Sequence, residues 1–351
     1  MAAVTSQVSA PRRLPSELSG VARSREAVIV VAFLAVVAAT TARNPAFVFS
    51  SDGWRDLLIS PSILILIAAG QAMVVITRNI DLSVGSILGL TAYLAGRLLT
   101  DIPGIPIVAV FVIGTLAGVG LGLINAILIA RFRLPALVVT LGTLYVFRGI
   151  DVLWAGATRI FPKDLPQEFL DLGTGQLMTI PYLTIIALVV VTGVWWYLKN
   201  TRAGRESYAV GSDPLAAVLH GLPSSRRIMV ALVASGALAG FAGVLYLARF
   251  ASADSQVGVG WELQSVAAVV VGGVAIFGGS GSVWGAAVGA VLLLTINRAL
   301  PVVGVPDFWQ RAVVGVLILA AIAADRYLLL RRARRPRTVR DTTSDRVAVN
   351  D

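Results

Sequence analysis

The chain has 351 residues, of which 57% are hydrophobic and only 14% carry a charge. So few polar residues cannot cover a water-facing surface of this size, which excludes an ordinary soluble protein and favours one that lies in lipid. The net charge of +10 could suggest nucleic acid, but the arginines lie between and after the apolar stretches, as they do in membrane proteins.

Apolar stretches of roughly 20 residues recur along the chain, each long enough to cross a bilayer as a helix. In chain order we expect about ten membrane-spanning helices, at Ala27–Thr41, Leu57–Thr77, Leu82–Leu99, Ile105–Ala130, Pro135–Trp154, Thr179–Leu198, Ile228–Ala248, Leu263–Phe277, Ser282–Leu300 and Trp309–Leu330. Several are short or rich in Gly and Pro, which indicates tilted, broken or re-entrant helices buried in protein. The expected fold is all-α and polytopic, with a cytoplasmic segment at 1–26, one membrane domain at 27–330 and a basic cytoplasmic tail at 331–351.

The lysines and arginines are spread unequally over the loops between these helices. If the N-terminus lies inside, most of them fall on the cytoplasmic side, with the run from Arg331 to Arg340. This distribution predicts that both termini are cytoplasmic and that the number of spans is even. The segments Gly156–Met178 and Arg249–Glu262 then face outward, and the first is a lid, a docking surface or a plain connector.

A glycine pattern recurs in two of the expected helices. Gly114, Gly118 and Gly122 are matched at a constant offset by Gly281, Gly285 and Gly289, and Arg131 is matched by Arg298. Under this topology the two helices run in opposite directions, which is typical of an inverted repeat whose halves rock around a central path. Glycine at every fourth position also lets helix backbones approach closely, so packing alone explains each triplet.

A polar, basic segment at Asn200–Pro223 separates two apolar stretches on the expected inner side. Asp213 is suited to cap a helix that begins at Pro214, and Gly221 is suited to end it. Apolar residues form a stripe on this helix: Leu215, Val218, Leu219 and Leu222. The pattern predicts a short amphipathic helix outside the bilayer, covered by lipid headgroups, by the chain's own helices or by a partner.

The same segment resembles the signature of the ribose-type permeases of bacterial sugar ABC importers. The matching residues are Thr201, Gly204, Arg205, Ala209, Gly211, Pro214, Ala216, Ala217 and Gly221. Further motifs agree in order and spacing: Ile80–Gly85, Leu134–Ala136, Thr140–Thr143, Arg148–Gly149, Ser235–Gly240, Ala267–Gly273 and Gly278–Ser282. The resemblance extends from about Leu57 to Leu319. Where the ribose-type pattern has two glycines this chain has Arg78-Asn79, which looks more like the rhamnose and autoinducer-2 branches and leaves the sugar open.

The resemblance implies a permease subunit of an ABC importer that moves a monosaccharide, rhamnose-like or another pentose or hexose, across the bacterial cytoplasmic (inner) membrane. The partners it implies are an ABC ATPase subunit, a soluble or lipid-anchored sugar-binding protein and a second permease chain, identical or paralogous. The outward segments would dock the binding protein. The amphipathic helix would couple to the ATPase through Pro214, Leu215, Ala216, Ala217, Leu219 and Gly221, with Arg205 flanking the contact.

Polar residues within the apolar stretches are the candidates for the sugar path. They are Gln71, Asn79, Asp81, Ser83, Asn125, Thr140, Thr143 and Tyr145. Asp81 and Ser83 are also suited to cap the helix that follows them, and Gly85 would permit a helix break there. Packing and bonding between helices explain any one of these residues equally well.

Several residue patterns argue against chemistry in this chain. The glycine-rich stretch Gly272–Gly285 lacks the lysine of a Walker phosphate loop, so ATP is expected to bind another polypeptide. The single histidine, His220, has no Cys, His or acidic partner at ligand spacing, and the sequence has no Cys. We therefore expect no enzyme, no catalytic residue, no metal site and no cofactor.

An ion-coupled secondary sugar transporter is the alternative function, since it shares the span number and the inverted repeat. Such transporters commonly keep charged groups deep in the spans. Here the acidic residues are expected at span ends: Asp52, Asp56, Asp81, Asp101, Asp151, Asp254, Glu262, Asp307 and Asp325. That distribution favours the ATP-driven importer.

Overall fold

The computed structural model describes residues 25–306 and the positions 309, 312, 313, 315, 316, 319, 320 and 323. The helices are α2 (Arg25–Arg43), α3 (Ala46–Phe49), α4 (Ser51–Ile59), α5 (Ser62–Ile76), α6 (Val84–Asp101), α7 (Ile107–Ala126), the π-turn η1 (Ile127–Arg131), α8 (Ala136–Ala155), the short η2 (Pro162–Asp164), α9 (Gln167–Thr174), α10 (Tyr182–Asn200), α11 (Arg202–Ser212), α12 (Pro214–Leu219), α13 (Ser224–Phe250), α14 (Trp261–Val271) and α15 (Val283–Val302). A small antiparallel hairpin, β1 (Gln176–Leu177) with β2 (Ile180–Pro181), accompanies them. The expected tail and most of the tenth span lie outside the described residues.

Six helical stretches among the described residues are long and apolar enough to cross a membrane: Asp52–Ile76, Ile107–Arg131, Ala136–Ala155, Tyr182–Asn200, Ser224–Phe250 and Val283–Val302. The all-α polytopic fold is confirmed, whereas the count of ten is not. One expected span is wrong in form, because Leu263–Phe277 is a helix of only 11 residues, α14, that ends at Val271. The following glycines, Gly272 and Gly273, lead into a loop instead.

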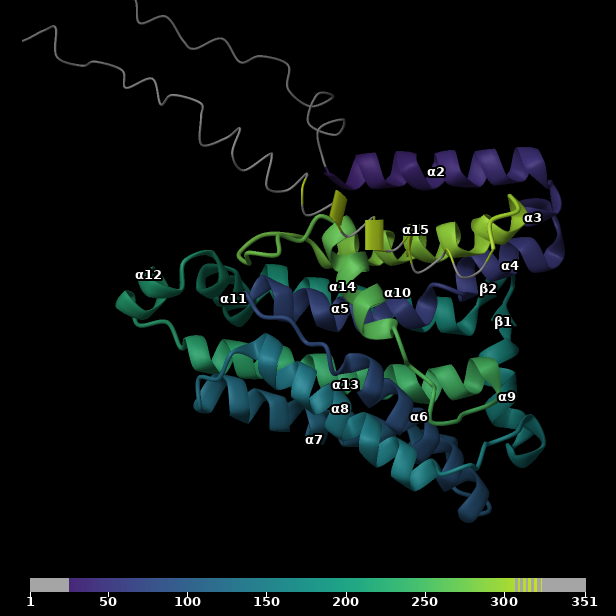
Figure 1. Cartoon of the computed structure of the whole chain (residues 1–351), viewed down its shortest axis with the longest axis horizontal. Coiled ribbons are helices and arrows are strands. Elements are labelled where there is room, and N and C mark those ends of the chain that lie inside the picture. The colour runs from purple at the N-terminus through teal and green to yellow at the C-terminus, as the bar shows by residue number, and fades with distance from the viewer. Residues whose placement is uncertain are drawn as a thin grey trace, which may run out of the picture.

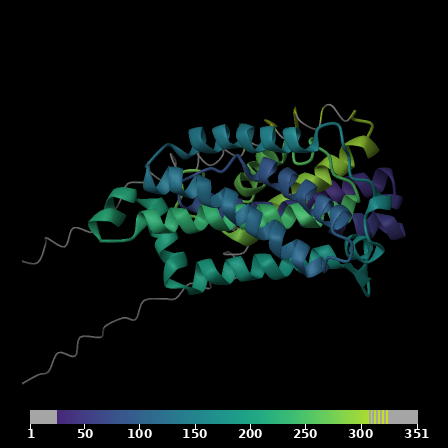
Figure 2. The same cartoon turned by 90° about the horizontal axis from the view of Figure 1, so that it is seen from below.

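The bundle has two ends with different elements (Figure 1). At one end lie α11 and α12. At the other lie α3, α4, α9 and the hairpin. Figure 2, turned by 90°, keeps these two groups at opposite ends of the long helices. The segments that the sequence assigns to the cytoplasmic and outer sides are therefore separated by the length of the bundle.

The core is organised around α13, which packs against α5, α6 and α7. Its contact with α7 is set by glycines. A methyl group on Gly118 of α7 would meet the carbonyl oxygen of Gly236 of α13, and a methyl group on Gly236 would meet the carbonyl oxygen of Gly118. Because each backbone occupies the space of the other's side chain, alanine at either position would push the helices apart. The packing role expected for this glycine pattern is confirmed.

The packing also agrees with the expected inverted repeat. Helix α7 packs against α13, whereas α15 packs against α5, and α5 and α13 touch each other beside Gly70. A two-fold relation that exchanges α5 with α13 and α7 with α15 would produce this exchange of partners. Both α5 and α13 are also followed by a non-helical segment and a new helix, which begins at Val84 in one case and at Trp261 in the other. The repeat itself stays a prediction.

Candidate translocation path and coupling surface

Buried polar side chains fill the break between α5 and α6, residues 77–83. One carboxylate oxygen of Asp81 accepts hydrogen bonds from the N–H and the hydroxyl of Ser83 at 3.0 and 2.7 Å, and the other accepts from the Ser235 hydroxyl of α13 at 3.0 Å. Ser83 Oγ accepts from Asn125 Nδ2 of α7 at 2.8 Å. Asn125 Oδ1 accepts from the Thr143 hydroxyl of α8 at 2.7 Å. One connected network therefore joins this break to α7, α8 and α13.

Two further side chains hold the backbone of the same break. Thr140 of α8 donates its hydroxyl to the Ile80 carbonyl at 3.1 Å. The Gln71 amide, oriented to satisfy both contacts, donates to the Asp81 carbonyl at 3.0 Å and accepts from the Asp81 N–H at 3.2 Å. Because unpaired polar groups are costly away from water, this pairing explains how an unwound segment remains inside the bundle.

Most of the residues selected from the sequence for the sugar path meet in this network. Six of them are buried within the chain: Gln71, Asp81, Ser83, Asn125, Thr140 and Thr143. The other two do not join it. Asn79 bonds the Thr77 carbonyl at 2.9 Å, and Tyr145 is 68% exposed on α8. Ser235 was not selected as a path residue, although it opens a motif that did match. Contact of any of these residues with a sugar stays a prediction.

The backbone conformation of Arg78, at the start of this break, explains why the ribose-type pattern has glycine there. Arg78 has φ of 68°, in the left-handed region that favours glycine. This is one of the two positions where the ribose-type pattern has glycine. An arginine held there costs about 1–2 kcal/mol relative to glycine, and its N–H still donates to the Val75 carbonyl at 2.8 Å.

A second break, residues 251–260, lies between α13 and α14. Arg148 of α8 holds it, because its Nη1 donates to the carbonyl oxygens of Ser255 at 3.0 Å and Val257 at 2.6 Å. The same nitrogen lies 3.4 Å from a carboxylate oxygen of Asp151, whose side chain is fully buried. Gly258, with φ of 80°, packs directly against the backbone of Gly85 in α6.

Three of the acidic residues expected at span ends do lie near helix ends, but inside the bundle and not at its surface. Asp81 and Asp151 are completely buried in the bundle. Glu262 lies beside Gly85, so it is not on the outer surface as expected for the segment Arg249–Glu262. The reason is that α14 is short: its first turn begins inside the bundle and not at a membrane surface.

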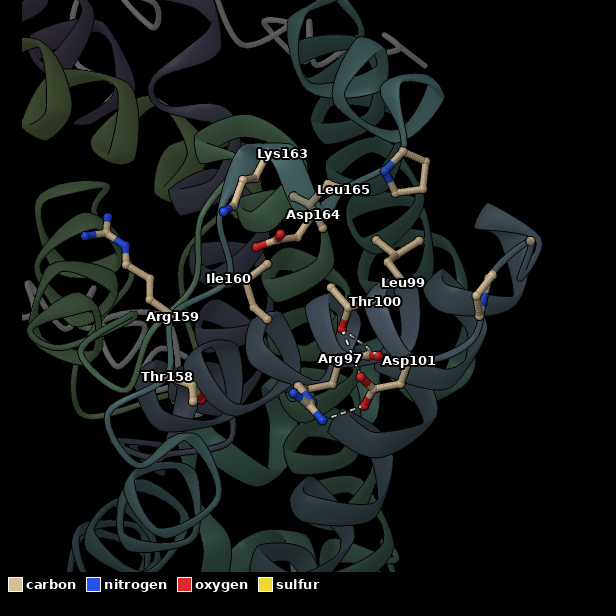
Figure 3. A pocket seen from close by; sticks show the side chains of 13 residues that line it. Arg97, Leu99, Thr100, Asp101, Thr158, Arg159, Ile160, Lys163, Asp164 and Leu165 are labelled. Carbon is tan, nitrogen blue, oxygen red and sulfur yellow. Dashed lines mark hydrogen bonds and ion pairs between the residues drawn. The ribbon is translucent and has the colours of Figure 1, made fainter.

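The two segments expected to face outward do meet at one end of the bundle. The Ile160 N–H donates to the Ala253 carbonyl at 2.9 Å, and Arg159 lies 3.8 Å from Asp254. Beside them is an open cavity of about 650 Å³. Figure 3 shows Lys163 and Asp164 on one side of it and the Arg97–Asp101 pair on the other. This mixed charged lining suits a protein surface better than a buried ligand site.

At the opposite end, α12 forms as expected from the sequence. The Asp213 side chain accepts from the N–H groups of Leu215 and Ala216, both at 3.0 Å, and caps a helix whose first residue is Pro214. Three of the four residues of the apolar stripe are uncovered, with Leu215, Val218 and Leu219 exposed by 79%, 63% and 86%, whereas Leu222 is half-buried. Ala217 alone packs inward. The helices that the structure describes therefore leave this face uncovered.

Helix α11 connects α12 to the bundle. Glu206, which is buried, lies 2.7 Å from Arg202 and 2.6 Å from Arg227 of α13. The hydrogen bond from Arg202, helped by Arg227, lowers the pKa of Glu206 below its ordinary value. The Tyr208 hydroxyl donates to the Gly281 carbonyl at 3.0 Å, which fixes α11 to the loop before α15.

Arg205 does not lie on α12. It projects from α11, is exposed, and donates to the Asn200 carbonyl at 3.3 Å. With Lys199 and Trp195 it lines a shallow cavity of about 360 Å³. The structure therefore brings together the helix residues expected to couple, while Arg205 is on the neighbouring element.

A bundle with two unwound segments entering from opposite ends, and an uncovered amphipathic helix at one end, defines a membrane transport permease. Comparison with known proteins agrees. The chain belongs to the family described as "Branched-chain amino acid transport system / permease component", whose model matches residues 55–322. The resemblance to ribose-type ABC permeases is confirmed, and the chain is a multi-pass transport component and not an enzyme.

Three relatives show the range of similarity. The autoinducer 2 import system permease protein LsrC of Escherichia coli K12/DH10B is 36% identical over 289 residues, covering 81% of this chain and 83% of the relative. LsrC of Enterobacter sp. strain 638 is 35% identical over 306 residues, covering 86% and 87%. The ribose import permease protein RbsC of Haemophilus influenzae is 33% identical over 300 residues, covering 85% and 92%. No solved structure matches the chain.

Proposed function

We propose that this chain is the permease of an ATP-driven importer for a monosaccharide or a sugar-like polyol of similar size. The observation that supports this most is the similarity to permeases named for ribose and for autoinducer 2 along more than four-fifths of the chain. Arg78-Asn79 before the first break agrees with the rhamnose and autoinducer-2 branches. A rhamnose-like substrate is therefore the more specific proposal.

Coupling to a separate ATPase subunit follows from the surface of α12. Three large apolar side chains more than 60% exposed, at Leu215, Val218 and Leu219, lie on a helix at the basic end of the bundle. Water is an unfavourable environment for such a stripe, and a groove in a partner protein removes it from water. The basic end is then cytoplasmic.

The outer end is proposed to receive the sugar-binding protein. The paired segments at Ile160 and Ala253, and the cavity with Arg97, Lys163 and Asp164, offer charged groups to a partner. A second permease chain, identical or paralogous, would cover part of the exposed apolar surface of α7 and α8. The substrate path would then run between the two chains.

Reconstitution tests the proposal. The chain, its ATPase subunit and its binding protein are placed in vesicles, and uptake of rhamnose, ribose, xylose, autoinducer 2 and leucine is measured with and without ATP. We expect ATP-dependent uptake of one of the sugar-like compounds. Uptake of leucine alone would contradict the proposed substrate class, and ion-driven uptake by the isolated chain would support the secondary-transporter alternative.

A further inference from the structure

The second break leads to a charged side chain inside the membrane domain. Figure 1 shows the chain turning back from the end of α13 toward the middle of the bundle, where α14 begins. A methyl group on Gly85 would meet Oε2 of Glu262, so this carboxylate lies at the level of Gly85. Gly85 is 16 residues before Asp101 in α6, or about 24 Å at 1.5 Å per residue. Since a hydrocarbon core is about 30 Å thick, Glu262 lies within it, on the side away from Asp101.

This carboxylate is not enclosed by the chain. Glu262 keeps partial exposure, and its neighbours Val259 and Leu263 are 50% and 54% exposed. Among the described residues it has no salt bridge, and the bond it accepts, from the Gly260 N–H at 3.1 Å, engages Oε1. A carboxylate at this depth faces either protein or water, because lipid solvates charge poorly. The exposed face at the start of α14 is therefore expected to border an aqueous path or a protein interface.

The side chains around this carboxylate suit a sugar. Trp261 is partly exposed and stands edge-on to Tyr246, with ring centroids 5.7 Å apart. Gln264, one turn further along α14, is also partly exposed. A carboxylate accepts hydrogen bonds from sugar hydroxyls, an amide both donates and accepts, and an indole covers the apolar face of a sugar ring.

We propose that Glu262, with Trp261 and Gln264, forms a hydroxyl-binding contact for the transported sugar inside the membrane domain. The proposal rests on the proposed function, since it names a part of the path within it. Arg148 is a positioning residue, because its bonds to Ser255 and Val257 fix the segment that leads to α14. The network around Asp81 has no such opening, since its side chains are already bonded to one another.

Uptake kinetics in the complete reconstituted importer test the contact. Glu262→Gln removes one charged acceptor, so kcat/KM for uptake is expected to fall about ten-fold, with Glu262→Asp recovering part of the loss. The loss should shrink for a substrate analogue that lacks the bonded hydroxyl, which a purely structural defect would not do. Asp56→Asn removes a carboxylate that bonds Arg249 at the outer end and should leave kcat/KM unchanged.

The absence of native cysteine permits a second measurement that does not depend on activity. Single variants Glu262→Cys and Gln264→Cys should react with a small, charged thiol reagent, and the transported sugar should slow the reaction. Val189→Cys, which lies within the apolar helix α10 and is 66% exposed, should stay unreactive. Wild-type uptake by Glu262→Gln, or no reaction at either cysteine, would overturn the contact. If the wild-type importer moves no sugar at all, the proposed function fails instead.

Discussion

Both breaks are non-helical segments between two helices, but the polar side chains of the first are buried and those beside the second remain partly exposed. Between α5 and α6, hydroxyls, an amide and a carboxylate pair with one another and are buried. Between α13 and α14, one arginine holds the backbone, and the residues around Glu262 remain partly exposed. The difference indicates that the first break connects α5 and α6 rigidly, whereas the second has polar side chains available to a substrate.

The largest effect is expected at the first break, residues 77–83, whose polar side chains are buried. Asp81→Ala leaves two hydroxyls and one N–H without their acceptor in a buried site, which should lower the free energy of unfolding by about 3 kcal/mol or more. Denaturant unfolding in detergent measures this. The control is Asp101→Ala at the exposed end of α6. Equal stability of the two variants would show that the hydrogen-bond network does not stabilise the break between α5 and α6.

A change at α12 should stop coupling while both breaks stay intact. Leu219→Asp places a charge on the exposed stripe, which should weaken ATPase binding by about 2–4 kcal/mol because the charge becomes buried at the contact. ATPase pull-down and sugar-stimulated hydrolysis measure it. Arg205→Ala should give a milder defect.

The neighbouring variant His220→Asp is the matched control, since it adds the same charge beside the stripe. Its binding to the ATPase should stay close to wild type. Wild-type pull-down by Leu219→Asp would mean that α12 lies on lipid and not on the ATPase. The folded membrane domain should be unaffected in both variants, because α12 makes few contacts with it.

Arg148→Met should loosen the second break, residues 251–260, and leave the first break, residues 77–83, unchanged. The Ser255 and Val257 carbonyls lose a charged donor, which is expected to lower the local opening free energy by about 1.5–3 kcal/mol. Hydrogen exchange should become faster in residues 252–260 and stay the same in residues 77–83. Faster exchange in both segments would mean that the two breaks are mechanically one unit.

The smallest effect concerns the ion pair between Glu206 of α11 and Arg227 of α13. Because the pKa of Glu206 is lowered in the folded chain, its ion pairs stabilise the fold above its ordinary pKa and are lost as the pH falls through the lowered value. Exchange of α11 amides should therefore rise only at acid pH below about 4.3. Glu206→Gln should remove this acid step, and a step that persists in the variant would assign it to another group.

The sequence predicted the helical class, the short capped helix α12 and, as candidates for the sugar path, most of the residues that form the polar network. Local rules are sufficient for these, since Asp213 and Pro214 specify where α12 begins, and polar residues in apolar stretches must find one another. The position of Glu262 was missed because hydropathy places it at the edge of a span. Its depth depends on where α14 begins relative to α6, which is tertiary information. The contact that reveals it is between Gly85 and Gly258, and nothing in either glycine alone indicates the other.

The contacts of α11 have a consequence for how motion would spread. A methyl group on Gly211 would meet the Ile76 carbonyl at the end of α5, and the Gly279 N–H also donates to that oxygen at 3.0 Å. Tyr208 reaches Gly281 before α15, and Glu206 reaches Arg227 on α13. Helix α11 thus contacts α5, α13 and the loop before α15. If an ATPase partner displaced α12, we expect α11 to pass that displacement to α5, α13 and the loop before α15 together.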